Sequence, residues 1–328
     1  AVDEVLDQTD PVAVFAHGEM HTRPSERVYD EGVAFVLWTS GTTGRPTPIL
    51  HPHAGYLELL DRVLGPLRAG PRDPERRPSP NLIPVPMALN AGIYNALFGL
   101  RAGASLVFLD EFTTGTFRML VRRHQIRSTV LPPAAMAMLT DDDAITDLYP
   151  LKYVRSITAP LSPFQARRFN EKFGVIVLNG YGQAEIGEVI GWTAAEAKEH
   201  PDKIGAVGRP HPGVDLRLDQ PDELGIGELL VRPPSLAAGY ASGDDLADRL
   251  TDDGFVHTGD LARIDDDGFV WIEWRRVDLI NRGGNKVFPD EVEEVLASVP
   301  GVREAAVVPA QEGRLGHVAL AVVGVEPG

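Results

Sequence analysis

Short apolar runs, rich in β-branched residues, alternate with longer segments of helical period between about residues 32 and 178. This alternation is typical of repeated βα units that build a largely parallel sheet. The strands predicted in this way are 33–38, 105–109, 128–131 and 175–178.

The helices between these strands are predicted from apolar stripes and from signals at helix ends. One helix covers 164–173, with Ser162 as the capping residue and Pro163 in the first helical position. Residues 69–81 combine proline with charge, which indicates a surface loop. Another helix covers 54–67 and places five side chains on one face: Leu57, Leu60, Val63, Leu64 and Leu67.

The sequence pattern changes after about residue 205, where short predicted strands are separated by Gly, Pro and Asp. This pattern favours a small antiparallel β subdomain. After about residue 278 the pattern predicts a helix that starts near Pro289 and ends before Gly301, followed by strands at 305–309 and 317–325. We therefore expect three parts, which are 1–204, 205–277 and 278–328.

The chain of 328 residues carries 31 Lys and Arg against 47 Asp and Glu, a formal net charge of −16. This excess of acidic residues argues against binding to nucleic acid or to an anionic membrane. The chain has no cysteine, so disulfides, a thiolate nucleophile and cysteine-ligated zinc are excluded. No apolar run is long enough to span a membrane and the first residues lack a signal-peptide pattern, so we expect a soluble cytoplasmic protein.

The segment TSGTTGRPTPI, residues 39–49, directly follows a predicted strand. Its glycines and hydroxyl side chains suit a loop that wraps an anion with backbone N–H groups. The Walker pattern does not fit, because Gly41 and Gly44 are too close together and no Gly-Lys-Ser/Thr follows. The segment is therefore a candidate phosphate loop of another type.

Five motifs follow one another along the chain: TSGTTGRP, NGYGQAE (179–185), GELLVR with the later Gly239-Tyr240, HTGD (257–260) and RVDLINRGGNKVFPDEVE (276–293). This series resembles the acyl-adenylate-forming superfamily, which includes acyl-CoA synthetases, peptide-synthetase adenylation domains and luciferases. The resemblance extends from about residue 34 to residue 323. It implies an α/β adenylate-forming enzyme fold, with a layered βαβ subdomain, a small β subdomain and a partial α+β C-terminal domain.

The resemblance also implies a site for ATP. Tyr181 would stack on adenine and Asn179 would meet its exocyclic amine, roles that suit an aromatic face and an amide. Thr43 would hold phosphate and be catalytic, and Glu185 would be catalytic through a bound Mg²⁺, which prefers hard oxygen ligands. The implied nucleotide-binding residues are Thr39, Ser40, Gly41, Thr42, Thr43, Gly44, Ala159, Asn179, Gly180, Tyr181, Gly182, Gln183, Asp260 and Arg275.

Asp260 matches the aspartate of the family that accepts hydrogen bonds from the ribose hydroxyls. The second ribose ligand of the family is an arginine. Counting back from Gly283 and Gly284 selects Arg275, whereas matching the Arg-Val-Asp string selects Arg276. The same ambiguity moves the expected hinge between Val277 and Asp278.

The chain departs from the family pattern in three places. Thr47 stands where the phosphate loop usually has lysine, which removes a cation near the pyrophosphate. Ala184 stands where the family has threonine, which removes a hydroxyl near the α-phosphate. The family's catalytic lysine near the C-terminus has no counterpart, since Lys286 matches an earlier motif. We expect a chain without that lysine to bind nucleotide and to adenylate slowly.

The predicted acid pocket lies in two segments. In 84–97, Ala88, Leu89 and Gly92 replace aromatic and histidine residues that many acyl-CoA synthetases carry, while Thr158 and Leu161 would form the opposite wall beside adenine. No aspartate suited to an α-amino group lies in 84–97, which favours an apolar acid over an amino acid. The histidines at 51 and 53 lack a third ligand at usable spacing, so we expect no metal site there.

The sequence thus predicts an ATP-dependent enzyme that converts an apolar carboxylic acid to acyl-AMP with the help of Mg²⁺. The acyl group would then pass to CoA or to the pantetheine of an acyl-carrier protein. The alternative is a degenerate homologue without catalysis that binds a nucleotide or an acyl ligand, which the changes at Thr47 and Ala184 favour.

Overall fold

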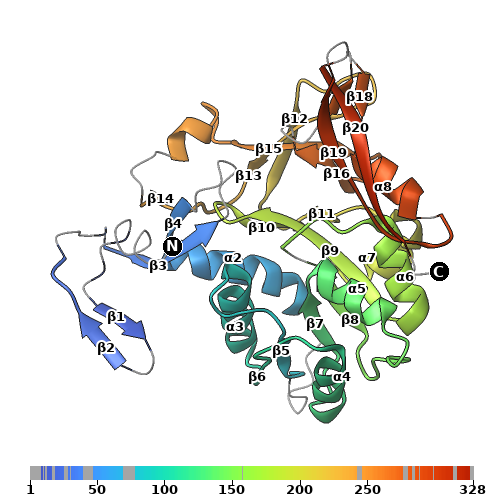
Figure 1. The fold of residues 1–328 in the computed structure, drawn as a ribbon. Coiled ribbons are helices and arrows are strands. Elements are labelled where there is room, and N and C mark those ends of the chain that lie inside the picture. The colour runs from blue at the N-terminus through green and yellow to red at the C-terminus, as the bar shows by residue number, and fades with distance from the viewer. Residues whose placement is uncertain are drawn as a thin grey trace.

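In the computed structural model, the described residues form five sheets (Figure 1). The structure describes residues 9, 11, 13–16, 19–25, 29, 31–39, 47–68, 78–156, 158–241, 246–275, 280–282, 285–287, 289–297, 299–312 and 316–325. In this part of the chain, no helix is both long enough and apolar enough to cross a membrane.

The largest sheet has seven strands in the order β11-β10-β9-β8-β7-β5-β6. Its parallel part is formed by β5 (Asn81–Ile83), β6 (Leu106–Phe108), β7 (Ser128–Leu131), β8 (Tyr153–Ser156) and β9 (Ile176–Gln183). The antiparallel strands β10 (Gly187–Gly191) and β11 (Arg209–Pro210) close one edge. The predicted parallel strands at 105–109, 128–131 and 175–178 are confirmed.

Helices α3 (Asn90–Ala102), α4 (Thr114–Arg123), α5 (Pro133–Asp141) and α6 (Pro163–Phe173) connect these strands. The apolar side chains of α4, α5 and α6 fill a continuous core that includes Phe117, Met136, Leu139 and Phe169. Those of α3 pack instead with side chains of α2 and β3. The helix predicted at 164–173 is confirmed with Pro163 as its first residue, but Ser162 makes no side-chain cap and contributes only its backbone carbonyl to Ala166 N.

The prediction for 33–38 is wrong in one respect. This strand, β3 (Val33–Thr39), does not join the parallel sheet but pairs antiparallel with β4 (Thr47–Pro52) in a three-stranded sheet with β14 (Gly239–Tyr240). The connection between residues 39 and 47 is too short for a parallel crossover, which takes about a dozen residues. A hairpin is the only pairing that this spacing allows.

Helix α2 (His53–Arg68) confirms the helix predicted at 54–67, but its buried face is different. Leu60, Val63 and Leu64 are buried as predicted, whereas Leu57 and Leu67 are 49% and 59% exposed. Tyr56 and Leu59 are buried instead, because α2 packs against both the three-stranded sheet and the start of β10.

A four-stranded antiparallel sheet follows, formed by β12 (Asp215–Asp219), β13 (Gly227–Arg232), β15 (Val256–Ile264) and β16 (Val270–Arg275). The predicted antiparallel pattern after residue 205 is therefore confirmed. Its apolar face shares one core with β10, which joins the small sheet firmly to the edge of the large one. The short elements α7 (Glu196–Glu199), η1 (Pro201–Lys203) and η2 (Leu246–Arg249) lie in the connections.

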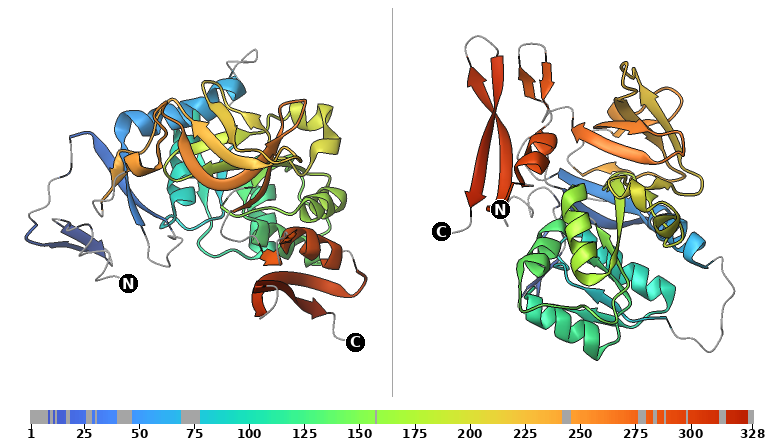
Figure 2. Two further views of the ribbon diagram at one scale, coloured as in Figure 1. Left: turned by 90° about the horizontal axis from the view of Figure 1, so that it is seen from above. Right: turned by 90° about the vertical axis from the view of Figure 1, so that its right-hand side faces the viewer.

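The C-terminal sheet has the order β18-β17-β20-β19, with β17 (Ile280–Arg282), β18 (Asn285–Val287), β19 (Val302–Glu312) and β20 (Gly316–Val325). Both views of Figure 2 place α8 (Pro289–Ala297) on the side of β19 and β20 that faces the rest of the molecule. The helix and strands predicted after residue 278 are present. Near the N-terminus, β1 (Ala13–Ala16) and β2 (Glu19–Thr22) form a separate hairpin.

Candidate functional site

Two strands from different sheets meet at a buried carboxylate. Asp260, in β15, is only 4% exposed, and its Oδ2 accepts a hydrogen bond of 2.5 Å from the Tyr181 hydroxyl. The Gln183 amide donates to the same oxygen at 2.9 Å and to the Thr258 carbonyl at 2.8 Å. Tyr181 and Gln183 are two apart in β9, so their side chains leave the same face of the strand and reach one acceptor.

Burial raises the pKa of the Tyr181 hydroxyl, and the neighbouring Asp260 carboxylate raises it further. The hydroxyl therefore stays protonated at neutral pH and donates to Asp260. Because both side chains are positioned by the fold, the Asp260 carboxylate has a fixed orientation before any ligand arrives.

A second polar cluster surrounds Glu185, which lies in the turn after β9. Its Oε1 accepts from Arg249 Nη1 at 2.7 Å and from the Tyr240 hydroxyl at 3.0 Å. Arg249 Nη2 also donates to Gln183 Oε1 at 2.8 Å and to the His257 carbonyl at 2.8 Å. Gln183 therefore links the Glu185 cluster to the Asp260 cluster in one continuous network.

The sequence did not predict Arg249 or Tyr240 as site residues. Tyr240 stands within a recognised motif, but Arg249 lies in η2, in a stretch that carries no motif. Its partners Glu185 and Gln183 are 64 and 66 positions away, so only the folded arrangement shows that they meet.

The turn between β9 and β10 positions Glu185 by its backbone. The Glu185 carbonyl accepts from Ala237 N at 2.8 Å, and Gly187 ends the turn with a φ of 68°. Gly182 must lack a side chain, because a Cβ there would lie 2.1 Å from the Gly187 carbonyl oxygen. The glycines of the 179–185 motif and its turn thus shape the hairpin that presents Tyr181, Gln183 and Glu185.

Residues 40–46, with Ser40, Gly41, Thr42, Thr43 and Gly44, lie outside the described residues. The two ends of this loop are described: Thr39 ends β3, Thr47 begins β4, and the two are paired across the hairpin. Strand β14 lies on the other side of β4, with Tyr240 opposite Ile49. The predicted phosphate loop therefore starts and returns beside the Tyr240 and Glu185 cluster.

The register of the small sheet bears on the two candidate arginines. Asp260 in β15 lies directly opposite Arg275 in β16. Arg276 lies outside the described residues, as do Val277 and Asp278.

Among the residues predicted to bind adenine, Asn179 and Gly180 belong to β9, and the side-chain Oδ1 of Asn179 accepts a hydrogen bond from Gly180 N at 3.1 Å. Thr158 follows β8 with a φ of 76°, which is strained for a β-branched residue and is a feature often found at functional sites. Ala159 beside it is exposed. The carboxyl ends of β8 and β9 share one edge of the parallel sheet, where ligands of such sheets bind.

The residues predicted to line the acid pocket divide into two groups. Ala88, Leu89 and Thr158 are exposed. Leu161 is buried in the main core, and Gly92 packs so tightly that a Cβ would lie 2.3 Å from the Pro86 carbonyl oxygen. Packing alone therefore accounts for the residue type at positions 92 and 161.

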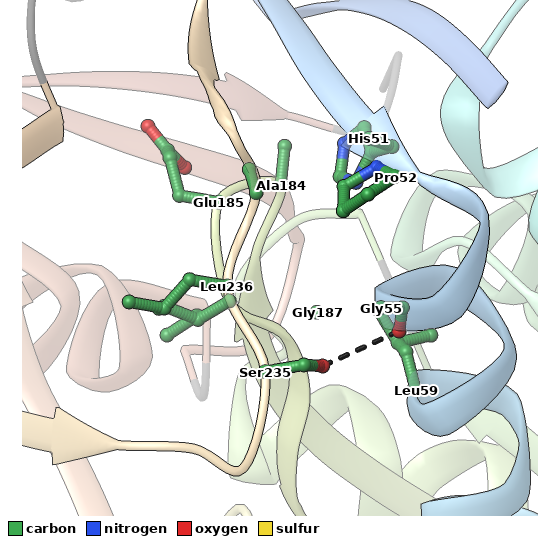
Figure 3. A pocket seen from close by; sticks show the side chains of 11 residues that line it. His51, Pro52, Gly55, Leu59, Ala184, Glu185, Gly187, Ser235 and Leu236 are labelled. Carbon is green, nitrogen blue, oxygen red and sulfur yellow. Dashed lines mark hydrogen bonds between the residues drawn. The ribbon is translucent and has the colours of Figure 1, made fainter. Parts of the chain in front are cut away.

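Beside Glu185 lies a small cavity between β4, α2 and the turn after β9 (Figure 3). His51 is 4% exposed, and its Nε2 is buried without a hydrogen-bond partner among the described residues. Burial lowers the pKa of His51 to about 4, although the Glu185 carboxylate raises it in part. Other lining residues are Gly55, Leu59, Ala184, Gly187 and Ser235.

Across the described ranges, no three His, Cys, Asp or Glu side chains lie close enough to hold a metal ion. Glu185 and the described side chains around it therefore do not form a complete metal site. A Mg²⁺ that arrives with a nucleotide needs fewer protein ligands, because it is commonly held by one or two carboxylates together with waters and phosphates. The donor set fits such a metal–nucleotide complex.

A parallel sheet that carries these polar groups at its strand ends, joined to a small β sheet and a C-terminal sheet, defines the fold of adenylate-forming enzymes. The ATP-bound crystal structure of MatB from Rhodopseudomonas palustris matches with a TM-score of 0.79 at 28% identity, over 90% of this chain and 58% of that chain. The model of the AMP-binding enzyme family matches residues 2–241. The chain belongs to this family.

Curated relatives support the same family. Peroxisomal OPC-8:0-CoA ligase 1 of Arabidopsis thaliana is 30% identical over 335 residues, which cover 98% of this chain and 60% of that protein. The 4-coumarate–CoA ligase-like 8 of the same plant is 30% identical over 314 residues, or 92% of this chain and 55% of that protein. The chain thus spans a little over half the length of these relatives.

Proposed function

We propose that the protein activates a carboxylic acid with ATP and passes the acyl group to a thiol. The observation that carries this proposal is the buried Asp260 carboxylate, which Tyr181 and Gln183 hold in a fixed orientation at the end of β9. An oriented, acceptor-only carboxylate suits the two hydroxyls of a ribose. Arg275, opposite Asp260 in the sheet, supports the assignment of a second ribose ligand.

In the first half-reaction, a carboxylate oxygen of the acid attacks the α-phosphorus of ATP, and the bond to the β-phosphate oxygen breaks. Acyl-AMP and pyrophosphate result. The predicted loop 39–44 would hold the triphosphate and Thr43 would donate to it, while Tyr181 and Asn179 would bind adenine. Mg²⁺, held by Glu185, would neutralise phosphate charge when bound.

In the second half-reaction, the thiol of CoA or of a carrier pantetheine attacks the acyl carbon, and AMP leaves. The acid itself would contact Ala88, Leu89 and Thr158, whose exposed and mainly apolar surfaces favour an acid with an apolar carbon skeleton. CoA ligases among the relatives favour CoA as the acceptor.

A second candidate is a homologue that binds nucleotide without turning it over. Ala184 favours this candidate, because it offers no hydroxyl beside the expected α-phosphate, and Thr47 offers no cation. Both candidates require the same nucleotide site, and they differ only in product formation.

The test is to incubate the purified protein with ATP, Mg²⁺, CoA and a panel of aliphatic and aromatic acids, and to follow AMP and acyl-CoA by mass spectrometry. We expect AMP and acyl-CoA to form in equal amounts with at least one acid. Tight nucleotide binding without AMP from any acid would support the second candidate instead.

A further inference from the structure

Arg249 makes two kinds of contact. Its Nε and Nη2 donate to the His257 carbonyl at 3.2 and 2.8 Å, and Nη2 also donates to Gln183 Oε1 at 2.8 Å. On the other side of the guanidinium, Nη1 contacts Glu185 Oε1 at 2.7 Å and the Tyr240 hydroxyl at 3.4 Å. The first set fixes the residue to the fold, so the Nη1 side can change partner while the anchor persists.

The guanidinium also contacts Tyr240, in the strand that pairs with β4. Tyr240 is opposite Ile49 in the sheet, and Ile49 is two residues from Thr47, where the predicted phosphate loop returns. The Arg249 side chain is 29% exposed, so it borders the open side of the cluster and is not enclosed in the core. Its planar set of donors matches phosphate oxygens well.

The Glu185 carboxylate cannot pair with Arg249 and bind a metal ion at the same time without placing two cations close together. A Mg²⁺ bound at Glu185 would bring a double positive charge close to the guanidinium, which is unfavourable unless a strong anion lies between them. The triphosphate of ATP is such an anion. Both cations then gain a partner.

We propose that Arg249 is a phosphate-binding residue that exchanges partners, pairing with Glu185 in the free protein and with the β- and γ-phosphates once Mg²⁺-ATP binds. It supplies at this position the cation that Thr47 does not supply in the phosphate loop. The inference rests on the proposed nucleotide site and adds a residue that the motifs do not include.

Calorimetric titration with Mg²⁺-ATP and with AMP separates this role from a structural one, because AMP lacks the β- and γ-phosphates. Arg249→Gln is expected to weaken Mg²⁺-ATP binding by about 10- to 100-fold, as for hydrogen bonds to charged groups, while AMP affinity changes less than about twofold. Arg217→Gln is the matched control, since Arg217 forms an exposed pair with Asp253 on another face of the small sheet. It is expected to change neither affinity. Equal losses for ATP and AMP in Arg249→Gln would show a structural role and overturn the proposal.

A second arm does not depend on the stability of Arg249→Gln. Glu185→Gln releases Arg249, so ATP in the presence of EDTA is expected to bind several-fold more tightly than to the wild type. In the double variant Glu185→Gln/Arg249→Lys, a lysine lacks the planar fork, and most of the gain should disappear. An equal gain in ATP affinity in the single and the double variant would reflect only the lost negative charge of Glu185. It would contradict the exchange of partners by Arg249. A wild-type protein that binds neither AMP nor ATP would overturn the proposed function itself, whereas the outcomes above concern Arg249 alone.

Discussion

At the scale of single residues, the site depends on side chains whose hydrogen bonds are already formed. Asp260 receives two donors from β9, and Glu185 receives two from η2 and β14. The motif in 179–185 led to Tyr181, Gln183 and Glu185, because the resemblance to the family rests on a short continuous segment that can be read from the sequence alone. Arg249 could not be predicted, since nothing in its own segment indicates that Glu185, 64 positions away, will lie next to it.

Asp260→Ala is expected to weaken AMP binding by about 1.5–3 kcal/mol, the range for hydrogen bonds that involve a charged group. The matched control is Asp253→Ala, which removes an exposed carboxylate paired with Arg217. Calorimetry should find the affinity of the control variant unchanged. If Asp260→Ala bound AMP as tightly as the wild type, Asp260 would be only a structural acceptor for Tyr181 and Gln183.

His51 should make folding stability depend on pH. Its pKa in the folded protein is about 4, below its ordinary value of 6.5, so the unfolded chain takes up a proton first as the pH falls. Stability is therefore full above pH 6.5, decreases as the pH falls towards 4, and loses about 3 kcal/mol in total. Urea unfolding between pH 7 and pH 4 measures this loss.

The variant His51→Gln should lack this part of the pH dependence, whereas His53→Gln, at an exposed neighbouring position, should retain it. The same slope in both variants would show that other groups cause the acid sensitivity.

At the scale of elements, the hairpin of β9 and β10 carries the site, and its glycines are steric requirements. Gly182→Ala would place a Cβ 2.1 Å from the Gly187 carbonyl oxygen and 2.8 Å from Glu188 Cα, both in the paired strand. We expect a loss of about 1–3 kcal/mol or more in stability and, because Tyr181 and Gln183 are displaced, a loss of AMP binding.

Gly115→Ala in α4 is the control for that substitution, since a Cβ there meets nothing within 4 Å. Denaturant unfolding should find this variant at least as stable as the wild type, because alanine favours the helix. If Gly182→Ala were as stable as the wild type, β9 and β10 could move apart to admit the added Cβ. Their close approach would then not determine the geometry of the site.

The strands also show what the sequence could not predict, which is the partner with which each strand pairs. The apolar runs at 128–131 and 175–178 gave the right strands in the right sheet, because parallel strands buried on both faces have a distinctive composition. The run at 33–38 has the same composition, yet it forms a hairpin with β4. An apolar run identifies a strand, but its partner is set by connection length and by the sheet that β14 completes.

At the scale of the whole molecule, the proposed nucleotide site draws on three sheets. The predicted phosphate loop joins β3 to β4, the predicted adenine-binding residues lie in β9, and Glu185 lies in the turn after β9. Asp260 comes from the small sheet. These parts are held together by backbone pairing and by the Arg249 network, so a change in one sheet is expected to affect the contacts of all three. Composition alone, with its net charge of −16, argues against some classes of partner but identifies none.

Exchange of labelled pyrophosphate into ATP tests whether this combined site forms acyl-AMP. We expect exchange that requires both Mg²⁺ and a carboxylic acid, that is lost in Glu185→Gln, and that persists in the surface variant Asp253→Ala. Exchange without any acid, or undiminished exchange in Glu185→Gln, would contradict the formation of acyl-AMP at this site. So would nucleotide binding with no exchange for any acid, which would mark the protein as a binder without catalysis.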